Sequence, residues 1–410
     1  MISLIDKKHC CGCSACVQRC PKQCIFLYED EEGFLYPKVN LEICIDCGLC
    51  EKVCPVFNQS EERKPLEVYA AKNPNEEIRR ESSSGGIFTL LAEQTIDAGG
   101  VVFGVRWNEH FEAIHDYTET KDGLAAFRGS KYVQSQVGDA FKQAEQFLKQ
   151  GRQVLYSGVP CQIAGLKKFL RKEYDNLLTV DIICHGSPSP GVFRWYMSEQ
   201  IQKLRYGAIR QSQRLPLHQI PSIDILAQQN GIQLQQINFR DKSTGWKSYC
   251  FTLEYSDKIN NKFEKISLSS GDQPFMSGFL HNLYLRPSCH VCPAKCGKSN
   301  SDLTLGDYWK ISTLYPDLDD NLGVSSICCN TIKGKNVLSG LGLHLYSASY
   351  EDLCLKNPSL IHSCKVSPKR SAFFAKQDDS FEKIILRLCR PSWIIRCKIV
   401  LKKFLSFYRK

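Results

Sequence analysis

Between residues 68 and 345, short apolar runs alternate with longer segments in which apolar residues recur at helical spacing. This alternation predicts an α/β domain built on a mixed sheet. The predicted strands are 101–107, 153–157, 177–184 and 302–309, and the predicted helices are 87–98, 138–150, 163–171 and 190–204. Runs 234–240 and 249–255 are expected to be strands of a second layer. The Gln-rich segment 205–229 has no clear period and is predicted to be a loop or insertion.

The segments before and after residues 68–345 show different residue patterns. Residues 1–57 predict a small α+β domain, in which 25–28 and 34–36 form a hairpin around Glu31-Glu32-Gly33. Residues 58–67 are polar, include a proline and are predicted to be a linker. Residues 346–410 are expected to form a C-terminal extension whose pattern is weak until a terminal helical segment.

The first domain carries one cysteine pattern twice, C-x2-C-x2-C-x3-C-P. This is the spacing of bacterial ferredoxins with two 4Fe–4S clusters, in which the fourth cysteine of each run ligates the other cluster. Zinc sites or a disulfide framework would use pairs of cysteines without the terminal C-P. The predicted ligand sets are Cys10, Cys13, Cys16 and Cys54 for one cluster, and Cys44, Cys47, Cys50 and Cys20 for the other. A domain of this kind moves electrons.

Composition and charge limit the cellular location and the partners that the sequence predicts. The 410 residues include 22 cysteines, no apolar run of membrane-spanning length, and no signal-peptide pattern at the start. Iron-ligating thiolates must stay reduced, so a cytoplasmic location is expected. Of the net charge of +10, nine positive charges fall within 383–410, and the rest of the chain is close to neutral. Nucleic acid is therefore not an expected partner.

A third cysteine group, Cys289, Cys292 and Cys296, has the spacing C-x2-C-x3-C and needs a distant fourth ligand to hold a cubane. Cys161 and Cys184 each follow an apolar strand, so either could reach a cleft at the strand ends. A third 4Fe–4S cluster is the favoured interpretation. A zinc site that includes His290, or free buried thiols, are the alternatives.

A phosphate site is predicted where a serine–glycine stretch precedes the helix at 87–98. Backbone amides at Ser84, Gly85 and Gly86 could bind an anion, with Arg128 and Lys131 as further contacts. The alternatives are an ordinary helix cap and a solvated turn.

Two single residues are candidates for proton transfer and for cofactor binding. His185, beside Cys184, could shuttle protons or serve as a structural histidine. Asp307, at a strand end, could hydrogen-bond a cofactor or cap the next turn.

The ordered motifs GVPCQIAGL, DIICHGSPS, FRDKSTGWKSY, LRPSCHVCPAKC and SDLTLGDYW resemble the coenzyme F-420 hydrogenase/dehydrogenase β-subunit family. That family also includes chlorophyll-cycle reductases and bacterial members that sit among polysaccharide-synthesis genes. The resemblance spans about 68–332 and implies an FAD-binding catalytic domain with its own 4Fe–4S cluster beside the flavin. It implies Cys289, Cys292 and Cys296 as ligands, with Cys161 or Cys184 as the fourth. The flavin contacts map to Ser84, Gly85, Gly86 and Lys131.

The resulting expectation is an iron–sulfur flavoprotein oxidoreductase. Electrons pass from the two N-terminal clusters through the third to FAD and an organic substrate, with a redox protein as donor or acceptor. One alternative is a non-catalytic electron-transfer subunit that serves a partner enzyme, possibly in polysaccharide biosynthesis; another is a scaffold without flavin. No sequence feature selects the deazaflavin coenzyme.

The C-terminal segment 392–410 predicts a basic amphipathic helix with apolar and cationic arcs. Such a helix could contact an anionic membrane surface peripherally, or pack on the body or on a partner subunit.

Overall fold

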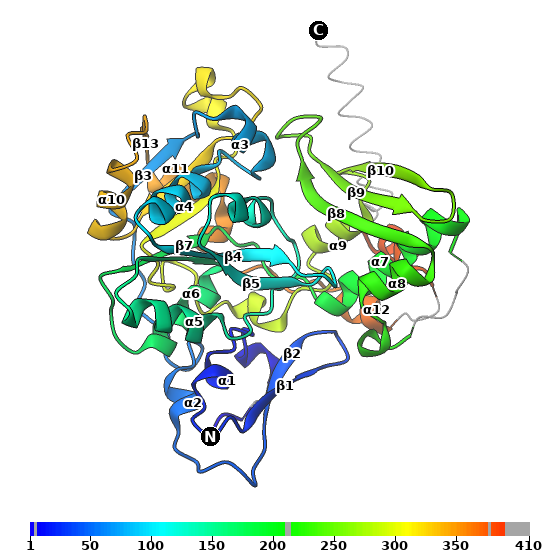
Figure 1. The fold of residues 1–410 in the computed structure, drawn as a ribbon, viewed down its shortest axis with the longest axis horizontal. Coiled ribbons are helices and arrows are strands. Elements are labelled where there is room, and N and C mark those ends of the chain that lie inside the picture. Colours follow the sequence, from blue (N-terminus) through cyan, green and yellow to red (C-terminus); the bar gives the residue numbers. More distant parts are fainter. Residues whose placement is uncertain (4–5, 210–214, 376–378, 390–410) are drawn as a thin grey trace.

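The computed structural model describes residues 1–3, 6–209, 215–375 and 379–389 (Figure 1). Its body is an α/β domain on an eight-stranded mixed sheet, with a three-stranded antiparallel sheet beside it and a small N-terminal module below. The predicted fold class is confirmed. The strands of the large sheet follow the order β13-β3-β12-β11-β7-β6-β4-β5.

Four strands at the middle of the large sheet are parallel, β4 (Val101–Trp107), β6 (Val154–Gly158), β7 (Leu177–Ile182) and β11 (Leu303–Asp307). They agree with the four predicted strands to within a few residues. Antiparallel strands complete the two sides of the sheet: β5 (Ala113–Thr118) beside β4, and β12 (Ser325–Cys329), β3 (Glu67–Ala71) and β13 (Tyr346–Ala348) beyond β11. The carboxyl ends of the four parallel strands therefore lie along one edge.

Helices cover both faces of this sheet. Val102 and Leu155 pack in a core with α4 (Ile87–Asp97) and α10 (Ile332–Ser339). Their neighbours Val101 and Val154 face the opposite core, formed with α5 (Ala140–Lys149) and α6 (Pro160–Leu170). Burial on both faces explains why these strands are continuous apolar runs in the sequence. Short helices α3 (Glu76–Glu81) and η2 (Asp122–Phe127) complete this part of the chain.

The second lobe has its own aromatic-rich core under the three-stranded sheet. Strands β8 (Ile232–Asp241), β9 (Cys250–Asp257) and β10 (Lys262–Ser269) pack with α7 (Pro190–Tyr206), α8 (Ile223–Gln229) and α9 (Pro274–Leu280). The prediction of a loop across 205–229 is wrong at α8. That helix has seven residues and buries only Ile223 and Ala227, so its Gln-rich exposed face hides the period.

Residues from 346 onward, expected to form an extension, contribute to the large sheet and to the second lobe. Strand β13 pairs with β3, and one face of α13 (Phe381–Cys389) is buried in the second lobe with Phe373 of α12 (Arg370–Ala375). Helix α11 (Tyr350–Lys356) lies between them in the chain. The predicted tail helix at 392–410 lies outside the described residues. Within the ranges that the structure describes, no helix is long and apolar enough to cross a membrane.

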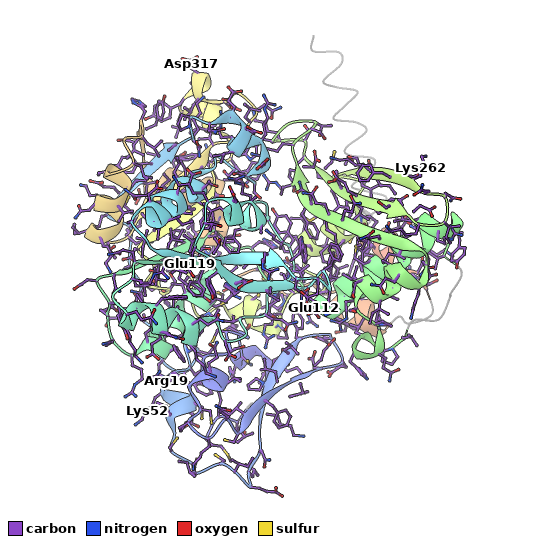
Figure 2. All side chains as sticks on the ribbon, in the orientation of Figure 1. Arg19, Lys52, Glu112, Glu119, Lys262 and Asp317 are labelled. Atoms are coloured by element: carbon purple, nitrogen blue, oxygen red, sulfur yellow. The ribbon has the colours of Figure 1, made fainter. Side chains whose placement is uncertain are left out.

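The N-terminal module consists of α1 (Ala15–Arg19), the hairpin β1 (Ile25–Glu29) and β2 (Leu35–Val39), and α2 (Leu49–Lys52). The predicted hairpin is confirmed. The module is held against the body by polar contacts: the Gln18 side chain accepts from two amides at the start of α5, and Arg19 pairs with Glu145 at 3.1 Å. Figure 2 labels Arg19 in the module. Glu32, in the hairpin turn, pairs with Arg370 of α12.

A buried histidine on β5 makes stability depend on pH. His115 stacks on Tyr156 at 5.6 Å, and burial lowers its pKa to about 4. Between pH 6.5 and 5 the unfolded chain protonates this histidine and the folded chain does not, so acid favours unfolding by about 2 kcal/mol. We expect the urea midpoint of the wild-type protein to fall more steeply over this range than that of His115→Gln. Equal slopes in the two proteins would contradict a neutral His115.

Candidate functional site

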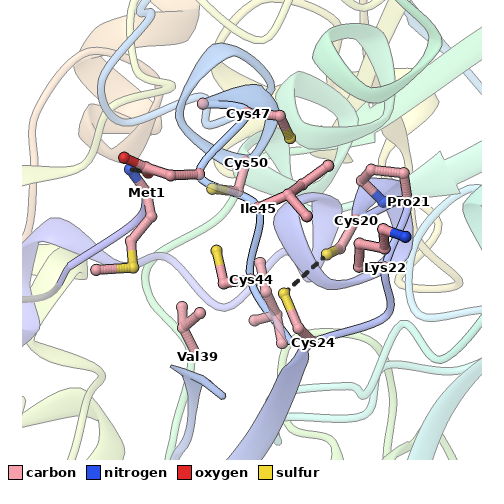
Figure 3. Close-up of a pocket in the computed structure, with 13 residues that line it drawn as sticks. Met1, Cys20, Pro21, Lys22, Cys24, Val39, Cys44, Ile45, Cys47 and Cys50 are labelled. Carbon is pink, nitrogen blue, oxygen red and sulfur yellow. Dashed lines mark hydrogen bonds and ion pairs between the residues drawn. The ribbon is translucent and has the colours of Figure 1, made fainter. Parts of the chain in front are cut away.

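Four of the predicted cluster cysteines line one pocket in the N-terminal module (Figure 3). They are Cys20, Cys44, Cys47 and Cys50, the set that the crossover pattern predicts for one cluster. The backbone N–H of Ile2 donates to Cys50 Sγ at 3.2 Å, a contact typical of cluster-bound sulfur. Cys47 is exposed, so this cavity, called the distal site below, is the one nearer to solvent.

A second pocket, called the proximal site, is lined by the other predicted set, Cys10, Cys13, Cys16 and Cys54. Three of these thiols are buried, and Cys10 is partly buried. Helix α6 of the body closely approaches this loop: a Cβ at position 165 would lie 2.8 Å from Cys13 Sγ, so only glycine fits there. The proximal site therefore faces the body, and the distal site faces away from it.

Cys11, an extra cysteine in the first run, lies between the proximal site and the body. It is buried in one core with Cys13 and Cys161, and its thiol interacts electrostatically with both of theirs. One thiol thus spans the boundary between the module and the edge of the large sheet.

The edge of the sheet brings a third set of thiols together. Cys161 begins α6 after β6, Cys184 follows β7, and Cys289 and Cys292 lie in or beside the short helix η4 (Pro287–Val291). Electrostatic interactions connect Cys161 with Cys184 and Cys292, and Cys184 with Cys289. Both candidates for the distant ligand are therefore in one group.

The surroundings of this group suit thiolate ligands. Burial raises the pKa of Cys184 and of Cys289 to about 12, so both thiols need a positive partner to ionise. The buried ammonium of Lys295 acts in the opposite direction on Cys184 and donates to the Cys184 carbonyl oxygen. The Ser187 N–H also donates to Cys289 Sγ at 3.3 Å. Cys161, Cys184, Cys289 and Cys292, with a cation and an N–H donor, fit a 4Fe–4S cubane, and the Cys364 thiol interacts with the same group.

Cys296 makes contacts of its own. Its Sγ donates to the Ile361 carbonyl oxygen at 3.4 Å, and its thiol interacts electrostatically with that of Cys354. The backbone at Cys296 has a positive φ of 55°.

The predicted phosphate contacts make internal bonds. Ser84 Oγ donates to the carbonyl oxygens of Gly306 and Val324, and Gly85 packs against β12. Arg128 pairs with Glu81, and Lys131 donates to three carbonyl oxygens of its own loop. Gly86 caps α4 with a left-handed conformation and no side chain accepts from the first turn of the helix, so the helix start keeps the anion-binding character of an N-terminus.

Sequence reasoning missed Arg240, the buried arginine of the FRDKS motif. Its guanidinium pairs with Asp307 at 3.1 Å and donates to the Ser83 carbonyl oxygen, while Asp307 also accepts from Trp246 Nε1 at 2.9 Å. The ring of Trp246 stacks on Trp309 at 5.0 Å. Asp307 thus belongs to an ion pair that joins the second lobe to the serine–glycine stretch. The Arg240 Nε atom is buried and has no partner among the described residues.

His185 is held in place beside the third thiol group. Its Nε2 lies 2.7 Å from Asn282 Oδ1, and its ring meets Phe279 edge-on at 5.1 Å. Burial lowers the pKa of His185, so the ring is neutral near pH 7.

Comparison with known proteins agrees with this assembly. Residues 9–58 match the 4Fe-4S dicluster domain. Residues 68–142 and 151–342 match the N-terminal and C-terminal models of the coenzyme F420 hydrogenase/dehydrogenase beta subunit, which together cover more than half of the chain. The fold and thiol groups define an iron–sulfur electron-transfer protein of the oxidoreductase type. The chain belongs to the coenzyme F420 hydrogenase/dehydrogenase beta subunit family.

Individual relatives match parts of the chain. One subunit of the F(420)H(2) dehydrogenase of Methanosarcina mazei is 25% identical over 195 residues, 45% of this chain and 55% of the relative. The 7Fe ferredoxin of Hydrogenibacillus schlegelii is 44% identical over 43 residues, 10% of this chain and 49% of the relative. The chain thus spans about half the length of these curated relatives. A chain of the F420-reducing [NiFe] hydrogenase complex of Methanosarcina barkeri aligns with a TM-score of 0.40 at 14% identity, covering 80% of this chain and 93% of that chain.

Proposed function

We propose that this protein carries electrons between a redox protein at its N-terminal module and an FAD held by its body, through three 4Fe–4S clusters. The distal and proximal sites each hold one cluster, and Cys161, Cys184, Cys289 and Cys292 hold the third. The observation that carries the proposal is the position of Cys11, which packs in one core with Cys13 of the proximal site and Cys161 of the third group. Ligands of the distal site in turn pack with Cys16 and Cys54 of the proximal site, so the three sites can act as one series.

The proposed flavin site is supported by the family and by two features of the body. The buried Arg240 guanidinium donates to the Ser83 carbonyl oxygen, three residues before Gly86 at the start of α4. A helix N-terminus and an arginine together suit the pyrophosphate of FAD. When bound, FAD would exchange single electrons with a cluster and a hydride with an organic substrate.

Two versions of this function differ in the group that finally accepts or donates the electrons. In the first, the protein is an oxidoreductase for a small organic substrate, and His185 near the third group supplies or takes the proton. In the second, it is an electron-transfer subunit for a partner enzyme, for example one of polysaccharide biosynthesis. The M. mazei relative is named a dehydrogenase subunit, which favours a partner protein. Substrate turnover by the isolated protein would separate the two versions.

The exposed ligand Cys47 offers a direct test of the series. We expect the full-length protein, purified without oxygen, to hold about twelve irons and one FAD, and Cys47→Ser to lose about four irons because each cubane has four. Flavin content should be unchanged, while reduction of the flavin by a low-potential donor slows. Cys250→Ser is the matched control, since that thiol lies on β9, away from the three groups. Zinc in place of iron, or flavin-free protein after reconstitution, would contradict the proposal.

A further inference from the structure

Arg286 of the body is fully buried against the proximal site, at 1% exposure. Its Nε donates to the Cys10 carbonyl oxygen at 2.7 Å, and its Nη2 lies 3.4 Å from Cys10 Sγ and 2.9 Å from the Leu35 carbonyl oxygen. The guanidinium also lies over the Tyr36 ring, 4.2 Å from its centroid. A residue three positions before Cys289 therefore directs its charge into the N-terminal module.

The partners of this guanidinium are unusual for a buried arginine. Besides Cys10, the donors reach a backbone carbonyl and Gln134 Oε1 at 2.9 Å, and none of these groups is a carboxylate. A buried cation without a counter-charge is costly. A cubane held by four thiolates has a net negative charge, so a cluster at the proximal site would compensate Arg286.

The two module sites differ in burial, and burial affects their reduction potentials. Reduction adds negative charge to a cluster, and a low-dielectric environment opposes that change. The proximal site, with three buried thiols, would then be harder to reduce than the distal site with its exposed Cys47. Electron transfer from the distal to the proximal cluster would then be unfavourable in free energy, unless a positive charge at the proximal site offsets the effect of burial.

We propose that Arg286 raises the reduction potential of the proximal cluster and so draws electrons from the distal cluster toward the third site. This inference rests on the proposed function, since it requires two clusters in the module. In the step concerned, the distal cluster is oxidised by one electron and the proximal cluster is reduced by that electron, with no bond or proton exchanged. Arg286 acts through the cluster ligand Cys10 and is a tuning residue.

Gln134 offers a second way to alter the same charge. Its Oε1 accepts from Arg286 and its Nε2 donates to the Cys11 carbonyl oxygen. Gln134→Glu would place a carboxylate on the guanidinium while keeping the arginine and its bonds to Cys10. The charge at the site is then reduced without removing the side chain that fills it.

The test is a potentiometric titration of the full-length protein, followed by electron paramagnetic resonance, with the distal signal assigned by its loss in Cys47→Ser. In Arg286→Gln we expect the equilibrium constant for transfer from distal to proximal cluster to fall about tenfold, equivalent to about 59 mV for one electron. Arg286→Lys, which keeps the charge, should stay near the wild-type value. Gln134→Glu should lower the proximal potential, and the distal potential should not move.

Several outcomes overturn the inference. One is an unmoved proximal potential in Arg286→Gln at full iron content; another is an equal shift in the Gln and Lys variants, which would indicate a purely structural role. If Arg286→Gln cannot be purified with its iron, an unchanged potential in Gln134→Glu overturns it. Wild-type protein without module clusters would overturn the proposed function as well, which distinguishes that failure from an unmoved potential in an intact module.

Discussion

Replacing Cys184 by serine is expected to remove about four of about twelve irons, whereas Cys296→Ser is expected to leave the iron content unchanged, since a cubane needs four thiolates. The reason is their placement. Cys184 interacts electrostatically with Cys289 and Cys292, while Cys296 is hydrogen-bonded to the Ile361 carbonyl oxygen. Iron and sulfide analysis of the two variants, purified side by side without oxygen, measures the difference.

The comparison decides between two ligand sets. Family resemblance implies Cys289, Cys292 and Cys296 with one of Cys161 and Cys184, whereas the structure groups Cys161, Cys184, Cys289 and Cys292. In the first case Cys296→Ser loses the cluster and one of the two strand-end variants keeps it. In the second, Cys161→Ser and Cys184→Ser both lose it. The N-terminal cluster signals should persist in all three variants and serve as the internal control.

The N-terminal sites were predictable because their ligands are encoded by local spacing. Three of four thiols in each set fall within seven consecutive residues, and the proline after each fourth cysteine marks the crossover. The two cavities of the module separate the eight cysteines into the same two sets. The parallel core strands were predictable for a similar reason, since burial on both faces leaves continuous apolar runs.

The third group depends on contacts that spacing does not encode. Cys161 and Cys184 were found because cysteines after neighbouring parallel strands meet at one edge. Cys296 was assigned from its spacing and from the family resemblance; its Sγ is hydrogen-bonded to the Ile361 carbonyl oxygen, and its role as a ligand stays a prediction that the iron analysis tests. Arg240 and Arg286 have no spacing signature: each is a single arginine whose long-range hydrogen-bond partners lie between 67 and 276 positions away. Two of the quoted motifs, FRDKS and LRPSC, contain them, and that was the available signal.

Arg240→Gln is expected to destabilise the body by about 3–5 kcal/mol, because it leaves Asp307 without its cation. The Arg240 side chain is 2% exposed and that of Asp307 is 16% exposed. The double variant Arg240→Gln/Asp307→Asn should recover most of this loss, since removing both charges leaves no buried ion unpaired. Urea unfolding of the three proteins measures the effect.

A matched control is the pair of Arg106 and Asp116, which joins β4 and β5 at 2.6 Å but is about one-third exposed on both sides. Arg106→Gln should cost no more than about 1 kcal/mol, because solvent screens the pair. An equal cost for the two arginines would show that burial does not set the effect.

Flavin content in the same variants tests whether Arg240 also binds the cofactor. If the guanidinium contacts the FAD pyrophosphate, the double variant regains stability and still loses flavin, because no neutral residue replaces the charge. If Arg240 only holds the second lobe to the Ser83 backbone, stability and flavin return together. The buried, unpartnered Nε of Arg240 favours the first result, since such a donor calls for an acceptor. Full flavin content in the double variant would assign Arg240 and Asp307 a purely structural role.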